Sequence, residues 1–333
     1  MRIGVIGAGA IGGTIAALLD RVGHLVEITA RGAQLDAIRA DGLILDGAWG
    51  SHTARVPAAE TLQQRPELAF VCTKAQDAAV AIRENGHLLE GIPVVIVQNG
   101  LAGLRQAAVL LPESDCVGAL ALYAASYLSP GRVTVTTSAT TYIGAGIGEP
   151  PPAALFVARI LDAAMPAVAI DNFVGAQWTK LIVNQINAMP AITGMSAQET
   201  LGDRRLRRIV TASMREAVRV GFASGVHYGS IQGLSNGVLR FVAAAPLWAG
   251  QLVPLLMKRR MGATPNPGST LQSIRRGQLT EIDYLNGAVV GEAREHGRDA
   301  PINAALVDLV HEVERTRAFP PAGTVVERMR ELV

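Results

Sequence analysis

The stretch Gly7-Ala8-Gly9-Ala10-Ile11-Gly12 decides the fold of the first half of the chain. It follows an apolar run, Arg2 to Ile6, that predicts a strand, and it opens a helical pattern that continues to Val22. In such a turn the first glycine permits the tight bend, the second lets the backbone approach a pyrophosphate, and the third allows the helix to pack closely on the strand. The helix N-terminus also favours phosphate. These six residues therefore predict a dinucleotide site, with a glycine-rich packing turn or a methyl-donor site as the alternative.

The pattern around this turn predicts a parallel sheet with crossover helices, because short apolar runs alternate with helical stretches. Two short runs, Gly42 to Asp46 and His52 to Val56, flank Gly47-Ala48-Trp49-Gly50 and predict a hairpin. Further strands are expected at Leu25 to Thr29, Leu68 to Thr73, Pro93 to Gln98, Cys116 to Tyr123 and within Arg132 to Ile143, and a further helix at Ala33 to Ala40.

The sequence changes character after the loop or linker Gly148-Glu149-Pro150-Pro151-Pro152. Ser196 to Glu199 and Thr280 to Asp283 have the pattern of capping boxes that open helices, and Gly297 suits a helix end. Helices are expected at Ala153 to Ala164, Asn172 to Ile186, Arg204 to Ala223, Glu281 to Glu295 and Pro301 to Thr316. The fold class is therefore α/β, with an N-terminal Rossmann-type doubly wound sheet over residues 1–170 and a C-terminal all-helical domain over residues 171–333.

Length and composition fit this two-domain interpretation and exclude several classes of protein. The 333 residues are 49% hydrophobic and 17% charged, which argues against disorder. The net charge is only +2 and no basic block occurs, so we expect no nucleic-acid partner. Two cysteines, Cys72 and Cys116, are too few for a disulfide framework, and the six histidines have no metal-ligand spacing. The sequence thus predicts a cytoplasmic protein without a metal site.

Two apolar stretches raise the question of membrane targeting. Met1 to Leu19 superficially resembles a signal peptide, but its glycines are better explained by the dinucleotide turn. Phe241 to Met257 is too short for a membrane span and contains Pro246 and Pro254. We expect it to be buried or to form a subunit interface, which predicts no membrane association and favours a homodimer.

The tip of the second strand predicts which nicotinamide cofactor binds. NAD-binding domains place an acidic residue there for the ribose 2′-hydroxyl, whereas NADP-binding domains place an arginine near the 2′-phosphate. Arg31 lies at this tip, and Glu27 lies inside the strand. We therefore expect residues 1–170 to bind NADP, although Arg31 is also explicable as a solvated loop charge.

The segment Gln177 to Asn187 is the strongest candidate for catalysis. Lys180, Asn184 and Asn187 are spaced i, i+4 and i+7 and fall on one face of a helix that is otherwise apolar. All but three of the 30 basic residues are arginine, so the retained Lys180 is a candidate for proton donation, which guanidinium cannot perform. A solvated polar edge is the alternative interpretation.

Four other candidates have simple local explanations. Lys74 and Asn99 follow predicted strands at the edge where doubly wound sheets bind ligands, yet Asn99-Gly100 is also a common turn pair. Glu281 lies in a predicted first helical turn, where the helix dipole favours a carboxylate. Ser269 after Asn266-Pro267-Gly268 has the pattern of an N-cap.

Together these residues resemble the ketopantoate reductase family, the NADPH-dependent 2-dehydropantoate 2-reductases. The resemblance extends over nearly the whole chain in family order. The matching segments are Gly7 to Gly12, Ala30-Arg31-Gly32, Thr73-Lys74-Ala75, Gln98-Asn99-Gly100, Trp178-Thr179-Lys180-Leu181 with Asn184, Ser269-Thr270-Leu271-Gln272, and Thr280 to Gly287.

The resemblance implies an NADP-dependent oxidoreductase that reduces a 2-keto acid to a 2-hydroxy acid, with 2-dehydropantoate to pantoate in pantothenate biosynthesis as the leading reaction. It implies that Lys180 gives a proton to the substrate carbonyl oxygen and also binds the substrate. By the same resemblance the cofactor is bound by Lys74, Asn99, Ala124 and Glu281, and the substrate by Asn184, Asn187 and Ser269. A relative that reduces a different 2-oxo compound, or a non-catalytic NADP-binding sensor, is the alternative.

Three departures from the family pattern concern the substrate side. The second asparagine of the helix, Asn187, comes seven residues after Lys180 where the family has eight, and Ala188-Met189-Pro190 follows it. Ala197 stands where pantoate-forming reductases have another substrate-binding asparagine. The region Val238 to Met261 is also unusually long and apolar. The pattern therefore predicts the type of reaction better than the substrate.

Overall fold

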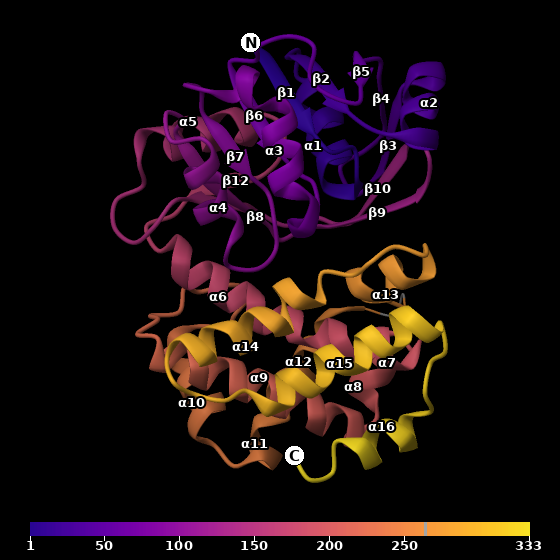
Figure 1. Ribbon diagram of the computed structural model, residues 1–333, viewed down its shortest axis with the longest axis vertical. Coiled ribbons are helices and arrows are strands. Elements are labelled where there is room, and N and C mark those ends of the chain that lie inside the picture. The colour runs from indigo at the N-terminus through magenta and orange to yellow at the C-terminus, as the bar shows by residue number, and fades with distance from the viewer. Residues whose placement is uncertain (263–264) are drawn as a thin grey trace. The chain divides into compact units, whose positions relative to one another are not determined.

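The computed structural model describes residues 1–262 and 265–333. The chain divides into two compact units, Met1–Val174 and Gly175–Val333, coloured from indigo to magenta and from magenta to yellow in Figure 1. The N-terminal unit has the α/β architecture expected from the sequence. Within the described residues, the C-terminal unit is helical apart from an isolated bridge between Ile231 and Leu234.

The N-terminal unit is built on an eight-stranded sheet in the order β12-β11-β8-β7-β6-β1-β2-β5. The strands from β8 to β5 in this order are parallel, and β11 runs antiparallel to β8. From β1 the chain passes to β2 on one side and later returns to β6 on the other, so the sheet is doubly wound. The strand bounds are β1 (Arg2–Ile6), β2 (Leu25–Thr29), β5 (Ala58–Ala59), β6 (Leu68–Val71), β7 (Val94–Ile96), β8 (Cys116–Ala121), β11 (Thr141–Gly144) and β12 (Ala167–Ala169).

Helices cover both faces of this sheet because its central strands are apolar on both faces. Val5 packs in the core that contains α1 (Ala10–Arg21) and α5 (Pro152–Asp162). The next residue, Ile6, packs in the opposite core with α3 (Ala75–Leu89) and α4 (Gly103–Leu110). The remaining helix is α2 (Gly32–Asp41).

A second sheet, in the order β4-β3-β10-β9, also belongs to this unit. The hairpin predicted from the sequence is confirmed, because β3 (Leu43–Gly47) pairs antiparallel with β4 (His52–Ala54). It is joined by β10 (Arg132–Thr137) and β9 (Ala124–Ser129). Helix α1 contacts strands of both sheets, so the glycine turn at its N-terminus is fixed from two sides.

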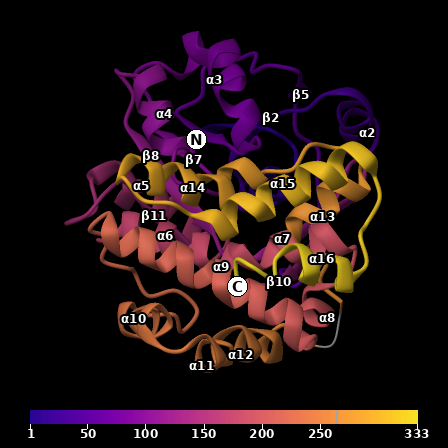
Figure 2. The ribbon, with the colours of Figure 1, turned by 60° about the horizontal axis from the view of Figure 1, so that its bottom comes forward.

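Helix α9 (Arg204–Ala223) is the centre of the C-terminal unit and has the bounds expected from the sequence. Figure 2 shows α14 and α15 along one side of it and α10, α11 and α12 along the other. The other helices are α6 (Phe173–Asn184), the 3-10 turn η1 (Gln185–Asn187), α7 (Ala188–Thr193), α8 (Ala197–Gly202), α10 (Asn236–Ala244), α11 (Leu247–Gly250), α12 (Leu252–Arg260), α13 (Gly268–Arg275), the 3-10 turn η2 (Ile282–Tyr284), α14 (Asn286–Glu295), α15 (Pro301–Thr316) and α16 (Ala322–Arg328).

One of the two predicted capping boxes is confirmed. The Ser196 hydroxyl accepts a hydrogen bond from the Glu199 N–H, and the Glu199 carboxylate accepts one from the Ser196 N–H. The box at Thr280 was wrong: the Thr280 hydroxyl accepts from the Ile282 N–H and opens only a 3-10 turn, while Asp283 lies 3.0 Å from His311. The Asp283 carboxylate, which the local spacing had assigned to a helix cap, thus pairs with His311, a residue distant in the sequence.

The N-cap predicted at Ser269 was also wrong. Helix α13 begins at Gly268, so Ser269 lies inside its first turn, and the Asn266 side chain accepts from the Gly268 N–H at 2.9 Å. Gly297 does end α14, with a φ of +64° that suits glycine.

The apolar segment Phe241 to Met257 is divided among three helices, and one side of it is buried while the other is exposed. Val242 and Val253 are buried, whereas Trp248 is 74% exposed. Among the described residues, no helix has the length and apolarity needed to cross a bilayer. The homodimer expected through this segment stays a prediction.

We predict that Gly12→Ala destabilises the N-terminal unit while Gly9→Ala does not. A Cβ at Gly12 would lie 2.0 Å from the Gly7 carbonyl oxygen, whereas a Cβ at Gly9 meets no atom within 4 Å, and Gly9 has a φ of −78° that alanine adopts freely. Overpacking of this kind costs about 1–3 kcal/mol, and an open surface site changes by about 0.5 kcal/mol or less. Chemical denaturation of both variants measures the difference, and equal stabilities would contradict the predicted packing of the turn.

Candidate active site

The glycine turn is held by the end of the neighbouring strand β2. Gly7 has a φ of +102°, and its N–H donates to the Thr29 hydroxyl at 3.0 Å. The Ala8 N–H donates to the Thr29 carbonyl at 2.9 Å. Gly12 is the position at which α1 lies closest to the turn, since a side chain there would overlap the Gly7 carbonyl. The glycines at positions 7 and 12 therefore have the structural roles expected from the sequence.

Gln34 supports the turn from α2, a contact that sequence reasoning missed. Its amide donates to the Ala8 carbonyl and accepts from the Gly131 N–H, both at 2.7 Å. Gln34 is 9% exposed, so the support is buried. The open side of the turn is at Gly9, with Ala10 and Ile11 partly buried beside it.

The other predicted cofactor residues of this unit follow the carboxyl ends of neighbouring parallel strands. Lys74 follows β6, Asn99 follows β7, and Ala124 follows β8. Lys74 and Asn99 are partly buried and Ala124 is exposed. Carboxyl ends of parallel strands lie at one edge of a sheet, where ligands of doubly wound folds bind. The topology thus brings the glycine turn and these three residues to the same edge.

Two buried oxygen atoms at this edge have no hydrogen-bond partner among the described residues. They are Thr73 Oγ1 and Gln98 Oε1, which precede Lys74 and Asn99. The Gln98 Nε2 group donates to the Thr73 carbonyl at 3.1 Å, so the two side chains are neighbours. Buried polar atoms are nearly always satisfied in folded proteins, and a polar ligand is one source of the missing partners. With the open face at Gly9, they fit a bound dinucleotide.

Two charged residues, Glu27 within strand β2 and Arg31 just after it, have different hydrogen-bond partners. Glu27 is 7% exposed, and its carboxylate accepts from the N–H groups of Gln63 at 2.7 Å and Gln64 at 3.3 Å. Glu27 is therefore occupied within the protein. Arg31 is exposed at the tip, and its guanidinium contacts the Glu84 carboxylate at 2.6 Å. Exposed pairs of this kind contribute little stability, so this contact exchanges readily with another anion.

In the C-terminal unit, the two residues that precede Lys180 anchor α6. The Thr179 hydroxyl lies 2.9 Å from the Gly175 carbonyl oxygen and 2.6 Å from the Gly229 carbonyl oxygen, which are the two acceptors for its one proton. Trp178 is 4% exposed and packs edge-on against Tyr228 with 6.5 Å between ring centroids. The position of the lysine along the helix is thus fixed by the two buried residues that precede it.

Burial changes the acidity of Lys180. Removal of water from around its ammonium group lowers the pKa from the ordinary 10.5 to about 8, and the nearby Glu281 carboxylate partly opposes this effect. Glu281 is partly buried at the start of η2. A lysine with this pKa is largely protonated at neutral pH and can still release its proton, which suits a general acid.

The helix face predicted from the sequence is remodelled after Asn184. The α-helix ends there, and the 3-10 turn Gln185–Asn187 places the Asn187 Nδ2 group 3.5 Å from Asn184 Oδ1. Residues three apart eclipse one another in a 3-10 helix. Pro190 explains the change, because it has no N–H for the Ile186 carbonyl and its ring would collide with that carbonyl in a continuous α-helix. Asn184 and Asn187 thus lie together despite the altered spacing.

The turn before α13 lies against this pair. Gly268 has a φ of +70°, and a Cβ there would be 2.7 Å from Asn187 Oδ1. Ser269 follows and is exposed. Ala197 is buried, and its N–H donates to the Asn266 carbonyl at 2.7 Å. The C-terminal unit thus brings Asn184, Asn187 and the backbone beside Ser269 together, and it brings Lys180 near Glu281.

Comparison with known proteins identifies the family. The family model described as ketopantoate reductase PanE/ApbA matches residues 3–148, and its C-terminal counterpart matches residues 172–314. The chain is 28% identical over 316 residues to 2-dehydropantoate 2-reductase of Archaeoglobus fulgidus, covering 94% of this chain and 98% of the relative. It is 29% identical over 330 residues to the protein of that name from Halobacterium salinarum, covering 95% and 99%.

Solved structures show the same fold. A ketopantoate reductase of Ralstonia eutropha superposes with a TM-score of 0.79 at 29% identity, covering 95% of this chain and 99% of the other. D-mandelate dehydrogenase with NADH and anilino(oxo)acetate superposes with a TM-score of 0.82 at 21% identity and the same coverage, which shows the shared fold. Because the models of one family match most of both units, the chain belongs to the ketopantoate reductase family and is an NAD(P)-dependent oxidoreductase.

Proposed function

We propose that this protein catalyses the NADPH-dependent reduction of a 2-keto acid to a 2-hydroxy acid, with 2-dehydropantoate as the leading substrate and pantoate as the product. The observation that carries the proposal is Lys180, whose pKa is lowered to about 8 on a helix that, with the 3-10 turn after it, also presents Asn184 and Asn187. Relatives that align over nearly their whole length bear the name 2-dehydropantoate 2-reductase, which supports this substrate and a place in pantothenate biosynthesis.

The residues of the C-terminal unit have distinct tasks in this proposal. When bound, a reduced nicotinamide supplies hydride to the carbonyl carbon. The Lys180 ammonium group binds the carbonyl oxygen and transfers one proton from Nζ to it, so that the C=O bond becomes CH–OH. Lys180 is left as a neutral amine and recovers a proton from water. The Glu281 carboxylate favours the charged form of Lys180 before the transfer.

The carboxamides of Asn184 and Asn187 and the Ser269 hydroxyl are proposed to bind the polar groups of the substrate. Asn187 and Asn184 lie 3.5 Å apart, and the Gly268 backbone lies against Asn187. A pair of amides offers both donors and acceptors, which suits a carboxylate and a hydroxyl on one small molecule. Loss of such a contact leaves a buried polar group unpaired and therefore discriminates between substrates.

The N-terminal unit is proposed to hold NADPH. The turn Gly7 to Gly12 would take the pyrophosphate, Arg31 the 2′-phosphate, and the residues that follow β6, β7 and β8, namely Lys74, Asn99 and Ala124, would line the rest of the cofactor. Glu27 supports the preference for NADPH over NADH, because its carboxylate already accepts two backbone N–H groups and is not available to a ribose hydroxyl. Glu281, predicted from the family resemblance to contact the cofactor, belongs to the C-terminal unit and influences Lys180.

A different 2-oxo acid is the second candidate substrate. The 3-10 turn that follows Asn184, and the buried Ala197 in place of an asparagine, both alter the proposed substrate side. D-mandelate dehydrogenase, which shares the fold, was solved with an aromatic 2-oxo acid, anilino(oxo)acetate. A screen of NADPH oxidation against 2-oxo acids of graded size and branching decides between these substrates, and absence of turnover with every acid would favour a cofactor-binding sensor.

Substitutions of Lys180 test the proposed proton donor. We expect Lys180→Ala to lower kcat by about 10² or more while NADPH affinity is retained, since a positioned general acid acts on the transition state. The wild-type kcat should be constant below pH 8 and fall above it, because the donor must be protonated and its pKa is about 8. Lys180→Arg should remain impaired and lose this basic limb, because guanidinium does not release a proton in this range. Near-normal turnover of Lys180→Arg would reduce Lys180 to an electrostatic contact.

Arg31→Ala tests the cofactor preference. We expect the Kd for NADPH to rise by about tenfold or more and the Kd for NADH to change little, because a charge-assisted contact to the 2′-phosphate is lost only for NADPH. Arg39→Ala is the matched control, since Arg39 lies on α2, the helix that directly follows Arg31, and donates to the Ala58 carbonyl. Isothermal titration of both cofactors against both variants measures the effect. Equal losses for NADPH and NADH in Arg31→Ala would refute the assignment.

Asn187→Ala tests the substrate side. We expect the KM for 2-dehydropantoate to rise by about tenfold, while the KM for 3,3-dimethyl-2-oxobutanoate, which lacks only the terminal hydroxyl, changes much less. The comparison is a double-mutant cycle in which the Asn187 carboxamide is removed from the protein and the terminal hydroxyl from the substrate, so it measures the interaction between these two groups. If 2-dehydropantoate is the best substrate by a wide margin and its kinetics survive this substitution, Asn187 has no role in binding.

A further inference from the structure

The C-terminal unit contains a cluster of four polar side chains from four separate elements, all with no exposed surface. They are Gln185 of η1, Ser213 of α9, Asn286 of α14 and Asn303 of α15. The Asn286 Nδ2 group donates to Gln185 Oε1 at 2.8 Å and to Asn303 Oδ1 at 2.9 Å. The Ser213 hydroxyl lies 2.9 Å from the first of these oxygens and 3.0 Å from the second. This cluster, the buried amide network, joins the elements at the centre of the unit.

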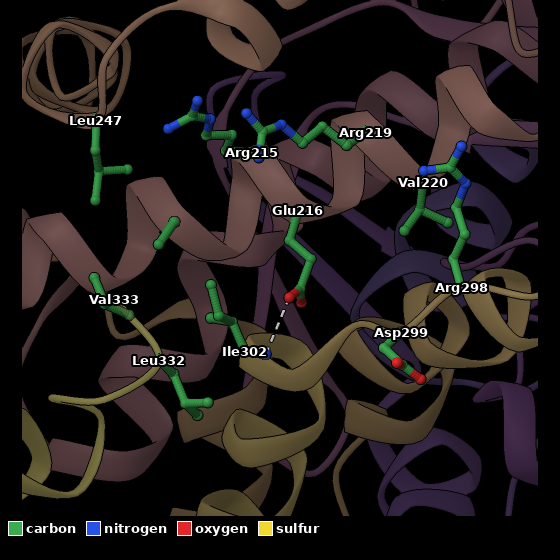
Figure 3. A pocket seen from close by; sticks show the side chains of 11 residues that line it. Arg215, Glu216, Arg219, Val220, Leu247, Arg298, Asp299, Ile302, Leu332 and Val333 are labelled. Carbon is green, nitrogen blue, oxygen red and sulfur yellow. Dashed lines mark hydrogen bonds between the residues drawn. The ribbon is translucent and has the colours of Figure 1, made fainter.

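The network continues to Glu216, one helical turn after Ser213 on α9. The Glu216 carboxylate accepts from Asn303 Nδ2 at 2.7 Å, from the Asn303 N–H at 2.8 Å and from the Ile302 N–H at 3.1 Å. Figure 3 shows this carboxylate directed toward Ile302 in a cavity of about 510 Å³. Glu216 therefore fixes the start of α15 from the outer end of the network.

The inner end of the network coincides with the proposed active site. Gln185 lies between Asn184 and Asn187 in the 3-10 turn that brings their carboxamides together. Its Nε2 group donates to the Leu181 carbonyl at 3.1 Å, so it also continues the helix of Lys180. Asn286 is the first residue of α14 and directly follows the short segment that begins with Glu281. The network thus fixes both segments that carry proposed substrate and proton-transfer groups.

Stability alone does not explain why amides occupy this place. Buried polar networks gain little net stability, and apolar side chains of similar volume often serve as well or better. Asn286 Oδ1 has no hydrogen-bond partner among the described residues, but the other polar atoms of the network are paired with one another. These contacts define one arrangement of the four elements, because a shift of any member leaves further buried polar groups unpaired. Reaction sites need such definition, since a displacement of about 1 Å can cost about 10²-fold in rate.

We propose that Gln185, Ser213, Asn286 and Asn303 are positioning residues for the reduction: Gln185 sets the 3-10 turn that presents Asn184 and Asn187, and Asn286 sets the distance from Glu281 to Lys180. This inference rests on the proposed function and adds residues outside the proposed substrate and cofactor contacts. It predicts two separable kinetic defects, one in substrate binding and one in the pH dependence of proton transfer.

Gln185→Met and Asn286→Leu separate these two defects. Gln185→Met keeps the size of the side chain and should raise the KM for the keto acid by about tenfold or more while the basic limb of kcat stays in place. Asn286→Leu should move the basic limb to lower pH, because a displaced Glu281 no longer supports the charged form of Lys180. Steady-state kinetics from pH 6 to 10, together with NADPH titration, measure both effects.

Two milder variants keep the test decisive if the larger substitutions prevent folding. Ser213→Ala removes one hydroxyl from the network and should produce a smaller rise in KM. Thr211→Val is the matched control, because Thr211 is buried on the same helix and its hydroxyl donates only locally, to the Arg207 carbonyl at 2.7 Å. Both remove one buried hydroxyl from α9, so we expect comparable losses of stability but unchanged kinetics in Thr211→Val.

The outcomes distinguish this inference from the proposed function. If Lys180→Ala is inactive and wild-type enzyme reduces keto acids, but Ser213→Ala and every network variant that folds match Thr211→Val in KM and in pH profile, the network is only structural and the inference is overturned. If wild-type enzyme turns over no keto acid, the proposed function itself fails. A KM defect in Ser213→Ala or Gln185→Met that is absent from Thr211→Val supports the positioning role.

Discussion

The desolvation of the partly buried Lys180 ammonium group is the physical constraint on which the proposed chemistry of the C-terminal unit depends. Removing water from a cation is costly unless another charge or a set of acceptors compensates, and the cost shows as the lowered pKa of about 8. The Glu281 carboxylate supplies part of the compensation. A donor in this balance holds its proton at neutral pH and gives it up when negative charge develops on an adjacent oxygen.

Such a balance depends on position, and the fold controls position by burying polar contacts among apolar side chains. Trp178 and Thr179 anchor α6 directly before the lysine. Pro190 ends the regular helix, and the resulting 3-10 turn brings two carboxamides together. In the N-terminal unit, Thr29 and Gln34 hold the glycine turn in a comparable way. In both units, residues without an evident chemical role fix the ones for which we propose such a role.

The sequence predicted the regular parts of the fold well, because periodicity and glycine chemistry are local. The glycine turn, the hairpin at β3 and β4, the helix Arg204–Ala223 and the Ser196 cap follow from neighbours in the chain. The two caps failed because other residues make the expected contacts, one of them distant in the chain and the other only three residues away. The Asp283 carboxylate contacts His311 and does not cap a helix. The Asn266 carboxamide, and not the Ser269 hydroxyl, accepts a hydrogen bond from the first N–H of α13.

The sequence predicted which residues make up the candidate site, but it did not predict the contacts that hold them in place. Lys180 stood out because lysine is rare in this chain. Pro190 was a local signal that the helix expected to continue to Ile186 ends at Asn184. Gln185, Ser213 and Asn303 gave no such signal, because an amide or hydroxyl in a helix is ordinary until its burial is known. The contact between Arg31 and Glu84 could not be predicted from the sequence either, because the two residues are 53 positions apart.

The scarcity of lysine allows the acidity of Lys180 to be measured directly. Protein labelled with 13C at the lysine ε-carbon contains three such sites, at Lys74, Lys180 and Lys258, and Lys180→Ala identifies the resonance of interest by its absence. Titration of that resonance in the complex with NADPH is the most direct test of proton donation by Lys180. We predict a midpoint near pH 8 that falls in Glu281→Gln, because burial lowers the pKa and the carboxylate opposes it. A midpoint at the ordinary lysine value of 10.5, unchanged in Glu281→Gln, would contradict it.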